Sequence, residues 1–309
     1  MISVVAPVFN EHDVLDAFIR RLLVLLDRLG EPAEAVLVDD GSTDGSLELL
    51  RKMVHDDPRL RVVALSRNFG HQRAITAGLE HARGDAVVVI DADLQDPPEV
   101  ITEMVQRWRE GNRVVYGVRT SRQGERTSKK VTSRWFYRLL SRISDTPVTR
   151  DSGDFRLLDR RVVDALLTMP EENRYLRGMV SWVGFRQCAV EYTREPRHAG
   201  TTKYTWRRMT GLAIDAITSF SDRPLRLAIQ IGSVVTTSAF LYGLWVIIGK
   251  IVNPSRAIPG YTSLLIAVLF LGGVQLLTIG ILGTYVSRIY RESKRRPLYV
   301  VAETIEHGP

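Results

Sequence analysis

Two long stretches without a charged residue constrain the fold of this chain more than any other feature. They run from Leu227 to Gly249 and from Ala257 to Ser287, 23 and 31 residues in length. A membrane-spanning helix needs about 20 mostly apolar residues. A pair of buried core helices is the alternative, but charge-free segments of this length are rare in soluble domains. The sequence therefore predicts two transmembrane helices, at about 227–250 and 261–287.

The flanks of these stretches predict a hairpin and its orientation. Residues 250–261 connect the stretches and include two prolines and one glycine, as expected for a turn. Both outer flanks then lie on one side of the membrane. Basic residues favour the cytosolic side, and they are more numerous on the outer flanks than in the connection. We therefore expect a multi-pass membrane protein whose amino-terminal domain and basic tail (289–309) are cytosolic.

Composition narrows the classes of protein to consider. The chain has a formal net charge of +7 and one cysteine, Cys188. A single cysteine excludes a disulfide framework within the chain and a metal site built from cysteines. The start of the chain lacks the basic and apolar regions of a secretory signal. Basic proteins often bind nucleic acid, but no nucleic-acid-binding motif is present, so we expect no nucleic acid partner.

Residues 1–204 alternate between two sequence patterns. Short runs rich in β-branched residues are typical of strands, and segments with the apolar spacing of amphipathic helices separate them. Strands that are apolar almost throughout favour a mostly parallel sheet covered by helices on both faces. We therefore expect one α/β domain over 1–204. Its predicted strands are 2–7, 35–40, 61–65, 85–93 and 113–118, and its predicted helices are 14–29, 46–54, 74–82 and 99–108.

Polar residues follow three of the predicted strands. Asn-Glu (10–11) follows the first, Asp-Asp (39–40) the second and Asp-Ala-Asp (91–93) the fourth. Ligands of such domains bind beyond the carboxyl ends of the parallel strands, so these residues should line one site. No GxGxxG motif follows any strand, which argues against a dinucleotide-binding Rossmann domain. A nucleotidyltransferase would need a glycine-rich basic loop where this chain has PVFNE (7–11).

Asp91 and Asp93 flank one residue at the end of an apolar strand. In an extended backbone, residues i and i+2 point the same way, so both carboxylates should face one spot. With the carboxamide of Gln95 they make a set of hard oxygen donors suited to Mg²⁺ or Mn²⁺. The alternative is that Asp93 or Asp96 only caps a helix that begins at the following prolines.

Asp39 and Asp40 allow two interpretations. One is a helix cap built with the Gly-Ser-Thr-Asp that follows. In the other, one carboxylate accepts a hydrogen bond from a nucleobase and the other accepts one from a ribose hydroxyl. His71 is also open, either as a solvated loop residue or as a contact to a ligand.

Two amphipathic segments are expected at the membrane surface. At about 131–144, arginines recur at every fourth position while aromatic and aliphatic residues line another face. This pattern suits a helix that lies among lipid headgroups, although an ordinary solvated run of charges is the alternative. A second such segment, 205–224, precedes the first predicted span.

Five motifs carry a resemblance to a known family: PVFNE (7–11), DDGSTD (39–44), SRNFG (66–70), DADLQDP (91–97) and SGDFRLLDR (152–160). Together they resemble the family-2 glycosyltransferases with the glycosyltransferase A fold, a Rossmann-like α/β fold. The similarity runs essentially from end to end and includes the predicted hairpin. It is strongest to polyprenyl-phosphate glycosyltransferases, namely bactoprenol glucosyltransferases and, more distantly, dolichyl-phosphate mannosyltransferases.

The resemblance implies an enzyme that transfers a hexose, with inversion, from a nucleotide sugar to a polyprenyl phosphate. It points to UDP-glucose and undecaprenyl phosphate, to Mg²⁺ or Mn²⁺, to the bacterial plasma membrane and to a homo-oligomer, specifically a tetramer. The alternatives are transfer of mannose from GDP-mannose and a catalytically silent nucleotide-binding scaffold. A processive polysaccharide synthase is disfavoured because the QxxRW motif of that class does not follow SGDF (152–155).

The resemblance also assigns residues, through the positions that match the family motifs. The nucleotide sugar is assigned to Pro7, Asn10, Glu11, Asp39, Asp91 and Lys203, the metal to Asp93 and Gln95, the lipid phosphate to Arg119 and Arg134, and catalysis to Asp154. Thr202 stands where the family usually has a serine before the lysine, so a hydroxyl is kept.

Physical chemistry qualifies the role of Asp154, which the resemblance implies to be a general base. A phosphate monoester has a second pKa of about 6, so it is mostly a dianion at neutral pH and already nucleophilic. We therefore expect Asp154 to orient the sugar or the acceptor at least as much as it removes a proton. The alternative is an acid that only caps a helix or pairs with Arg156.

Overall fold

The computed structural model describes residues 1–119, 152–194, 223–252 and 260–307. The chain divides into two units, Met1–Met209 with Arg296–Pro309 and Thr210–Arg295. The predicted amphipathic helix at 131–144, nearly all of the second amphipathic segment, Arg134 and Lys203 lie outside the described residues.

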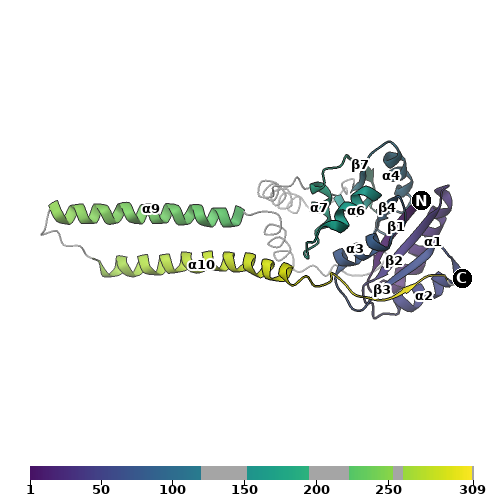
Figure 1. The fold of residues 1–309 in the computed structure, drawn as a ribbon, viewed down its shortest axis with the longest axis horizontal. Helices are drawn as coiled ribbons and strands as arrows, with labels where there is room; N and C mark the ends of the chain where they lie inside the picture. Colours follow the sequence, from purple (N-terminus) through teal and green to yellow (C-terminus); the bar gives the residue numbers. More distant parts are fainter. Residues whose placement is uncertain (120–151, 195–222, 253–259, 308–309) are drawn as a thin grey trace. The chain divides into compact units, whose positions relative to one another are not determined.

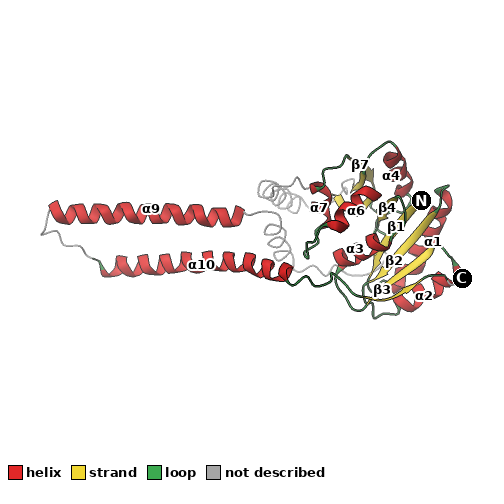
Figure 2. Cartoon of the chain, viewed as in Figure 1, coloured by secondary structure: helices red, strands yellow, loops and turns green. Residues whose placement is uncertain are grey.

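One sheet organises the first unit (Figures 1 and 2). Its eight strands in the described part of the chain have the order β7-β5-β6-β4-β1-β2-β3-β8. They are β1 (Ile2–Val8), β2 (Ala33–Asp39), β3 (Leu60–Leu65), β4 (Ala86–Val89), β5 (Val114–Arg119), β6 (Ser152–Asp159), β7 (Gln187–Tyr192) and β8 (Val301–Ile305). The strands β4, β1, β2 and β3 are mutually parallel, whereas β6 and β8 run antiparallel to their neighbours. The predicted α/β fold with a mostly parallel sheet is confirmed.

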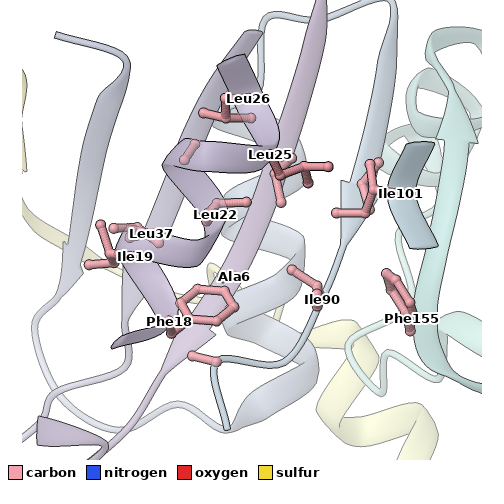
Figure 3. Close-up of a cluster of buried hydrophobic side chains, with 14 of the residues drawn as sticks. Ala6, Phe18, Ile19, Leu22, Leu25, Leu26, Leu37, Ile90, Ile101 and Phe155 are labelled. Carbon is pink, nitrogen blue, oxygen red and sulfur yellow. The ribbon is translucent and has the colours of Figure 1, made fainter. Parts of the chain in front are cut away.

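Helices cover both faces of this sheet because its central strands carry apolar side chains toward each face. Successive strand residues point to opposite faces, so Val4 packs into one core and Val5 into the other. One face is covered by α1 (His12–Arg28), α2 (Ser46–Asp56) and α4 (Val100–Arg109), and the other by α3 (His71–His81), α6 (Arg160–Thr168) and α7 (Leu176–Trp182). Figure 3 shows the first core, where Phe18 and Leu22 of α1 face the sheet.

Each predicted strand and helix of the first unit is present, whereas β6, α6, α7 and β7 were not predicted. Two further differences concern the fourth strand and the tail. The fourth strand ends at Val89 instead of continuing to residue 93, because the chain turns sharply around Leu94, whose φ is 59°. The tail was predicted as a separate basic segment, but β8 within it pairs with β3 at the edge of the sheet. Its five residues make a weak sequence signal, and the pairing joins segments that lie more than 200 residues apart.

The second unit contains two long helices that contact each other, α9 (Arg223–Val252) and α10 (Tyr261–Ser293). Each helix includes one of the two stretches predicted as transmembrane helices. Among the residues that the structure describes, one helical segment, Phe270–Ser293, meets the length and composition needed to cross a membrane. Both spans and the hairpin remain predictions.

Candidate functional site

The carboxyl ends of three neighbouring strands bring the predicted polar residues to one edge of the sheet. β1 lies between β2 and β4 and is parallel to both. Val8 is opposite Asp39, and the N–H of Asp40 donates to the carbonyl of Val8 at 2.9 Å. Pro7 is buried in β1 opposite Val38. The segments after these strands, which carry the acidic motifs, therefore start side by side.

Asn10 and Glu11 bind the segment that follows β2. The carboxamide oxygen of Asn10 accepts a hydrogen bond from the backbone N–H of Thr43 at 2.8 Å. The backbone N–H of Asn10 donates to Ser42 Oγ at 3.0 Å. The N–H of Glu11 donates to Ser46 Oγ at 3.2 Å. Asn10 therefore contacts the DDGSTD motif, and Glu11 contacts Ser46 just after it.

Asp39 presents an acceptor that no described residue uses. The side chain is buried, and its Oδ2 accepts a hydrogen bond from the N–H of Ser42 at 3.2 Å. Its Oδ1 is buried without a hydrogen-bond partner among the described residues. Burial raises the pKa of Asp39, although the hydrogen bonds from Ser42 oppose the shift. Buried acceptors are almost always satisfied, so this oxygen suits an O–H or N–H donor of a ligand.

Asp40 has a different task from its neighbour. Its two oxygens accept hydrogen bonds from the N–H groups of Phe69 and Gly70 at 2.7 and 2.9 Å, and the side chain is buried. Gly41 follows with φ of +70°, and a Cβ there would lie 2.6 Å from the backbone carbon of Arg67. Asp40 therefore holds the SRNFG segment, and its contact with a nucleoside stays a prediction.

His71 connects two carboxylates from different parts of the chain. It begins α3, and its Nε2 lies 3.5 Å from Asp91 Oδ1 and 3.4 Å from Asp154 Oδ2. Burial raises the pKa of Asp91 to about 6, in spite of the nearby imidazole. Of the two interpretations that the sequence leaves open, the structure excludes a histidine that contacts only solvent.

Asp154 is held as an anion by several donors. Arg177 of α7 donates to both of its oxygens, from Nε at 2.9 Å and from Nη2 at 3.2 Å, and Gln72 Nε2 donates at 3.2 Å. The predicted alternative partner, Arg156, lies farther away at 3.9 Å. Burial alone would raise the pKa of Asp154, but hydrogen bonds from His71 and Arg177 hold it well below its usual range. Such a carboxylate is a poor proton acceptor.

The metal-binding prediction concerns Asp93 and Gln95. Asp93 Oδ1 accepts a hydrogen bond from the backbone N–H of Gln95 at 3.0 Å, which shapes the turn after β4. Neither Asp93 nor Asp96 caps the following helix, since α4 begins at Val100 with Glu99 at the cap position. The capping alternative is therefore wrong.

Asp96 forms a second charged cluster beside this turn. Its side chain is buried, and its Oδ1 accepts a hydrogen bond from Tyr192 Oη at 2.6 Å. Arg119 Nη2 lies 3.6 Å from Asp96 Oδ2, and Arg194 Nε lies 3.5 Å from Oδ1. Arg194 Nη2 is also 4.0 Å from Asp93 Oδ2. Two guanidinium groups thus face the acidic turn, which makes this part of the site suited to phosphate.

The residues present fit a divalent cation only if a substrate supplies further ligands. Within the described residues, no group of three or more histidine, cysteine or acidic side chains is placed to hold a metal ion. Asp93 and Gln95 provide one carboxylate and one carboxamide, which are hard oxygen donors of the kind that Mg²⁺ and Mn²⁺ prefer. Diphosphate oxygens could complete such a shell.

Sequence reasoning missed several residues of this site. Gln72 and Asp96 lie within or beside the motifs and could have been noticed there. In contrast, Arg177, Tyr192 and Arg194 belong to later segments without a distinctive local pattern. They join the site only because α7 packs on the sheet and β7 forms one of its edge strands.

Comparison with known proteins shows which family and which relatives this chain resembles. The sequence profile of glycosyl transferase family 2 matches residues 3–167. The chain is 49% identical over 302 residues to an uncharacterized glycosyltransferase of Bacillus subtilis (strain 168), covering 98% of this chain and 93% of that protein. It is 43% identical over 302 residues to the bactoprenol glucosyl transferase of Shigella phage SfV, covering 97% of each.

A solved structure shares the fold. The mannosyltransferase from Pyrobaculum calidifontis in complex with GDP-Man and Mn²⁺ is 17% identical, with a TM-score of 0.50. The similarity covers 90% of this chain and 83% of that one.

Proposed function

Because this chain belongs to glycosyl transferase family 2, we propose that it transfers glucose from UDP-glucose to undecaprenyl phosphate, with inversion at the anomeric carbon. The enzyme would make the polyprenyl-phosphate sugar at the cytosolic face of the bacterial plasma membrane. Full-length relatives named bactoprenol glucosyl transferases support the substrates. The observation that carries the proposal is the meeting of Asp39, Asp91, Asp93 and Asp154 around one edge of the sheet, with arginines beside them.

In this reaction, an oxygen of the acceptor phosphate attacks the anomeric carbon. A bond forms between that carbon and the phosphate oxygen, and the bond to the nucleoside diphosphate breaks with its electron pair. The acceptor is mostly a dianion above a pH of about 6, so it needs little help from a base. Asp154 therefore acts by orienting the reactants, in agreement with the low pKa that Arg177 and His71 impose.

The remaining site residues bind the donor and neutralise charge. Asp39 Oδ1, which has no donor among the described residues, would accept a hydrogen bond from the nucleoside. Arg119 and Arg194 would attract phosphate groups. Asp93 and Gln95 would hold Mg²⁺ or Mn²⁺, which supplies positive charge for the leaving diphosphate. By resemblance, Lys203 contributes at the diphosphate and Arg134 at the lipid phosphate.

We infer the membrane attachment from the second unit. A soluble helix keeps apolar residues on a buried face, whereas α9 and α10 expose large apolar side chains along their length. These side chains include Phe240, Trp245 and Val252 of α9, and Leu264, Leu276, Ile279 and Ile289 of α10. Lipid would cover these side chains if both helices crossed the membrane as a hairpin. We also propose a homo-oligomer, a tetramer, on the resemblance alone.

The proposal is tested with membranes from cells that express the protein. They are incubated with labelled UDP-glucose, undecaprenyl phosphate and Mg²⁺ or Mn²⁺, and the organic phase is analysed by mass spectrometry. We expect a labelled lipid whose formation stops with a chelator and in Asp93→Ala. Asp16→Ala is the matched control, because Asp16 lies on the exposed face of α1 and pairs only with Arg20 there. Absence of labelled lipid with UDP-glucose and with other common nucleotide sugars would overturn the proposal.

A further inference from the structure

We propose that His71 is a positioning residue, whose imidazole holds the carboxylates of Asp91 and Asp154 at a fixed separation for sugar transfer. The inference rests on the proposed function. A single nitrogen, Nε2, lies within 3.5 Å of both carboxylates. The Oδ1 atom of Asp91 is buried and makes no hydrogen bond within the part of the chain that the structure describes. The imidazole is therefore the polar group that ties this oxygen to the rest of the site.

The fold fixes the imidazole through a motif that lies about thirty residues earlier. Asp40 binds the N–H groups of Phe69 and Gly70, the two residues that immediately precede His71. Gly70 has φ of +101°, a conformation that glycine adopts readily and other residues do not. α3 then begins at His71, so the imidazole projects from the first turn of a helix whose entry is fixed. An ordinary solvated histidine would need none of these contacts.

Electrostatic repulsion explains why the imidazole of His71 is needed between Asp91 and Asp154. Asp91 and Asp154 carry like charges, which repel at short distance in a partly buried site. Asp154 is anchored from other directions by Arg177 and Gln72. Asp91 has a near like charge in Asp93 as well as in Asp154. Loss of the imidazole would therefore leave Asp154 in place but allow Asp91 to move away from it.

The consequence concerns the rate of transfer more than the binding of substrate. Asp91 follows β4, and Asp154 lies on β6, which is the neighbour of β4. Groups placed to orient a sugar must keep their spacing to a fraction of an ångström, and a shift of about 1 Å can cost 100-fold in rate. The nucleoside would be held elsewhere, by the residues after β1 and β2. Loss of His71 should therefore lower kcat and leave KM for the nucleotide sugar nearly unchanged.

The test uses the full-length enzyme in detergent and measures kcat and KM with UDP-glucose. His71→Leu removes the donor, whereas His71→Gln keeps an N–H in nearly the same place. His81→Gln is the matched control, because His81 ends the same helix and its Nδ1 bonds to the carbonyl of Ala77, away from both carboxylates. We expect kcat to fall by about 100-fold in His71→Leu, to recover by about tenfold in His71→Gln, and to stay near the native value in His81→Gln.

A double variant shows whether His71 acts through the carboxylates. In the Asp154→Asn background, the added change His71→Leu should lower kcat by less than about threefold, since one partner of the bridge is already neutral. Two outcomes would overturn the proposal: a native kcat in His71→Leu, or equal losses in His71→Leu and His71→Gln. A fully multiplicative loss in the double variant would also overturn it.

Thermal unfolding separates this inference from the proposed function. The midpoints of thermal unfolding are compared without substrate for the native protein, His71→Leu, Asp154→Asn and the double variant. A smaller drop in the double variant than the sum of the single drops supports the contact, and additive drops contradict it. If the native protein transfers no sugar while the midpoints show coupling, the proposed function fails and the contact stands.

Discussion

Arg177 of α7 and Asp154 of β6 form a two-pronged ion pair, with Nε 2.9 Å from Oδ1 and Nη2 3.2 Å from Oδ2. Parallel hydrogen bonds of this kind are among the strongest that a carboxylate makes. They keep Asp154 ionised and aimed in one direction. The residue that the family resemblance assigns as a base is therefore a fixed anion in this structure.

The first prediction concerns the dependence of transfer on pH. Because the pKa of Asp154 lies well below its usual range, the side chain stays ionised over the whole working range of the enzyme. We expect kcat/KM to rise between pH 5 and 7 with the second ionisation of the acceptor phosphate, whose pKa is about 6, and with the ionisation of Asp91. Asp154→Asn should lower the whole curve and keep this rise, because both titrating groups remain. Loss of the rise in this variant would restore Asp154 as the base.

The second prediction is that Asp91→Asn stabilises the protein while impairing transfer. Burial raises the pKa of Asp91 to about 6 from 3.8. The protonated form therefore favours folding, and this contribution is lost as pH rises through about 6. One pKa unit corresponds to about 1.4 kcal/mol, so the variant should gain on the order of 3 kcal/mol at pH 7.5.

Thermal unfolding with a chelator present checks the sign of this effect. The difference in stability between Asp91→Asn and the native protein should shrink as the native side chain becomes protonated. It should be nearly gone by about pH 4. A variant that is less stable than the native protein at pH 7.5 would contradict the assignment. An advantage that does not change with pH would contradict it too.

The third prediction concerns the link between the DDGSTD and SRNFG motifs. Asp40→Ala removes a buried carboxylate and leaves the half-buried N–H groups of Phe69 and Gly70 without their acceptor. An unsatisfied buried group costs about 1–3 kcal/mol, so we expect a loss of about 2–4 kcal/mol in urea unfolding. Transfer should fall as well, because His71 follows directly. Asp56→Ala, on the exposed end of α2, is the control and should behave like the native protein.

The fourth prediction tests β8 as part of the catalytic unit. Ile305 packs against the core beneath β3, whereas its neighbour Thr304 is exposed. Ile305→Asp should lower the free energy of unfolding by about 1–3 kcal/mol, and Thr304→Asp should leave it within about 0.5 kcal/mol of the native value. Equal effects of the two changes would mean that the strand does not pack on the sheet in solution.

Contacts between distant segments could not be read from the sequence. The buried Arg61 pairs with Glu34 at 3.1 Å and with Glu306 of the tail at 2.8 Å. Asp40 was assigned with Asp39 because the two are adjacent, yet its partners are backbone groups of Phe69 and Gly70. No local pattern distinguishes an aspartate that binds a ligand from one that binds the chain.

The sequence by itself determined the central strands, their helices and the edge at which the acidic residues gather. These features follow from the spacing of apolar residues over a few turns or pleats, which is a local property. Only the tertiary structure decided that Arg177 anchors Asp154, that His71 lies between Asp154 and Asp91, and that β8 completes the sheet. Each of these joins segments far apart in the chain, and such pairings depend on how the packed elements meet, not on the residues that are neighbours in sequence.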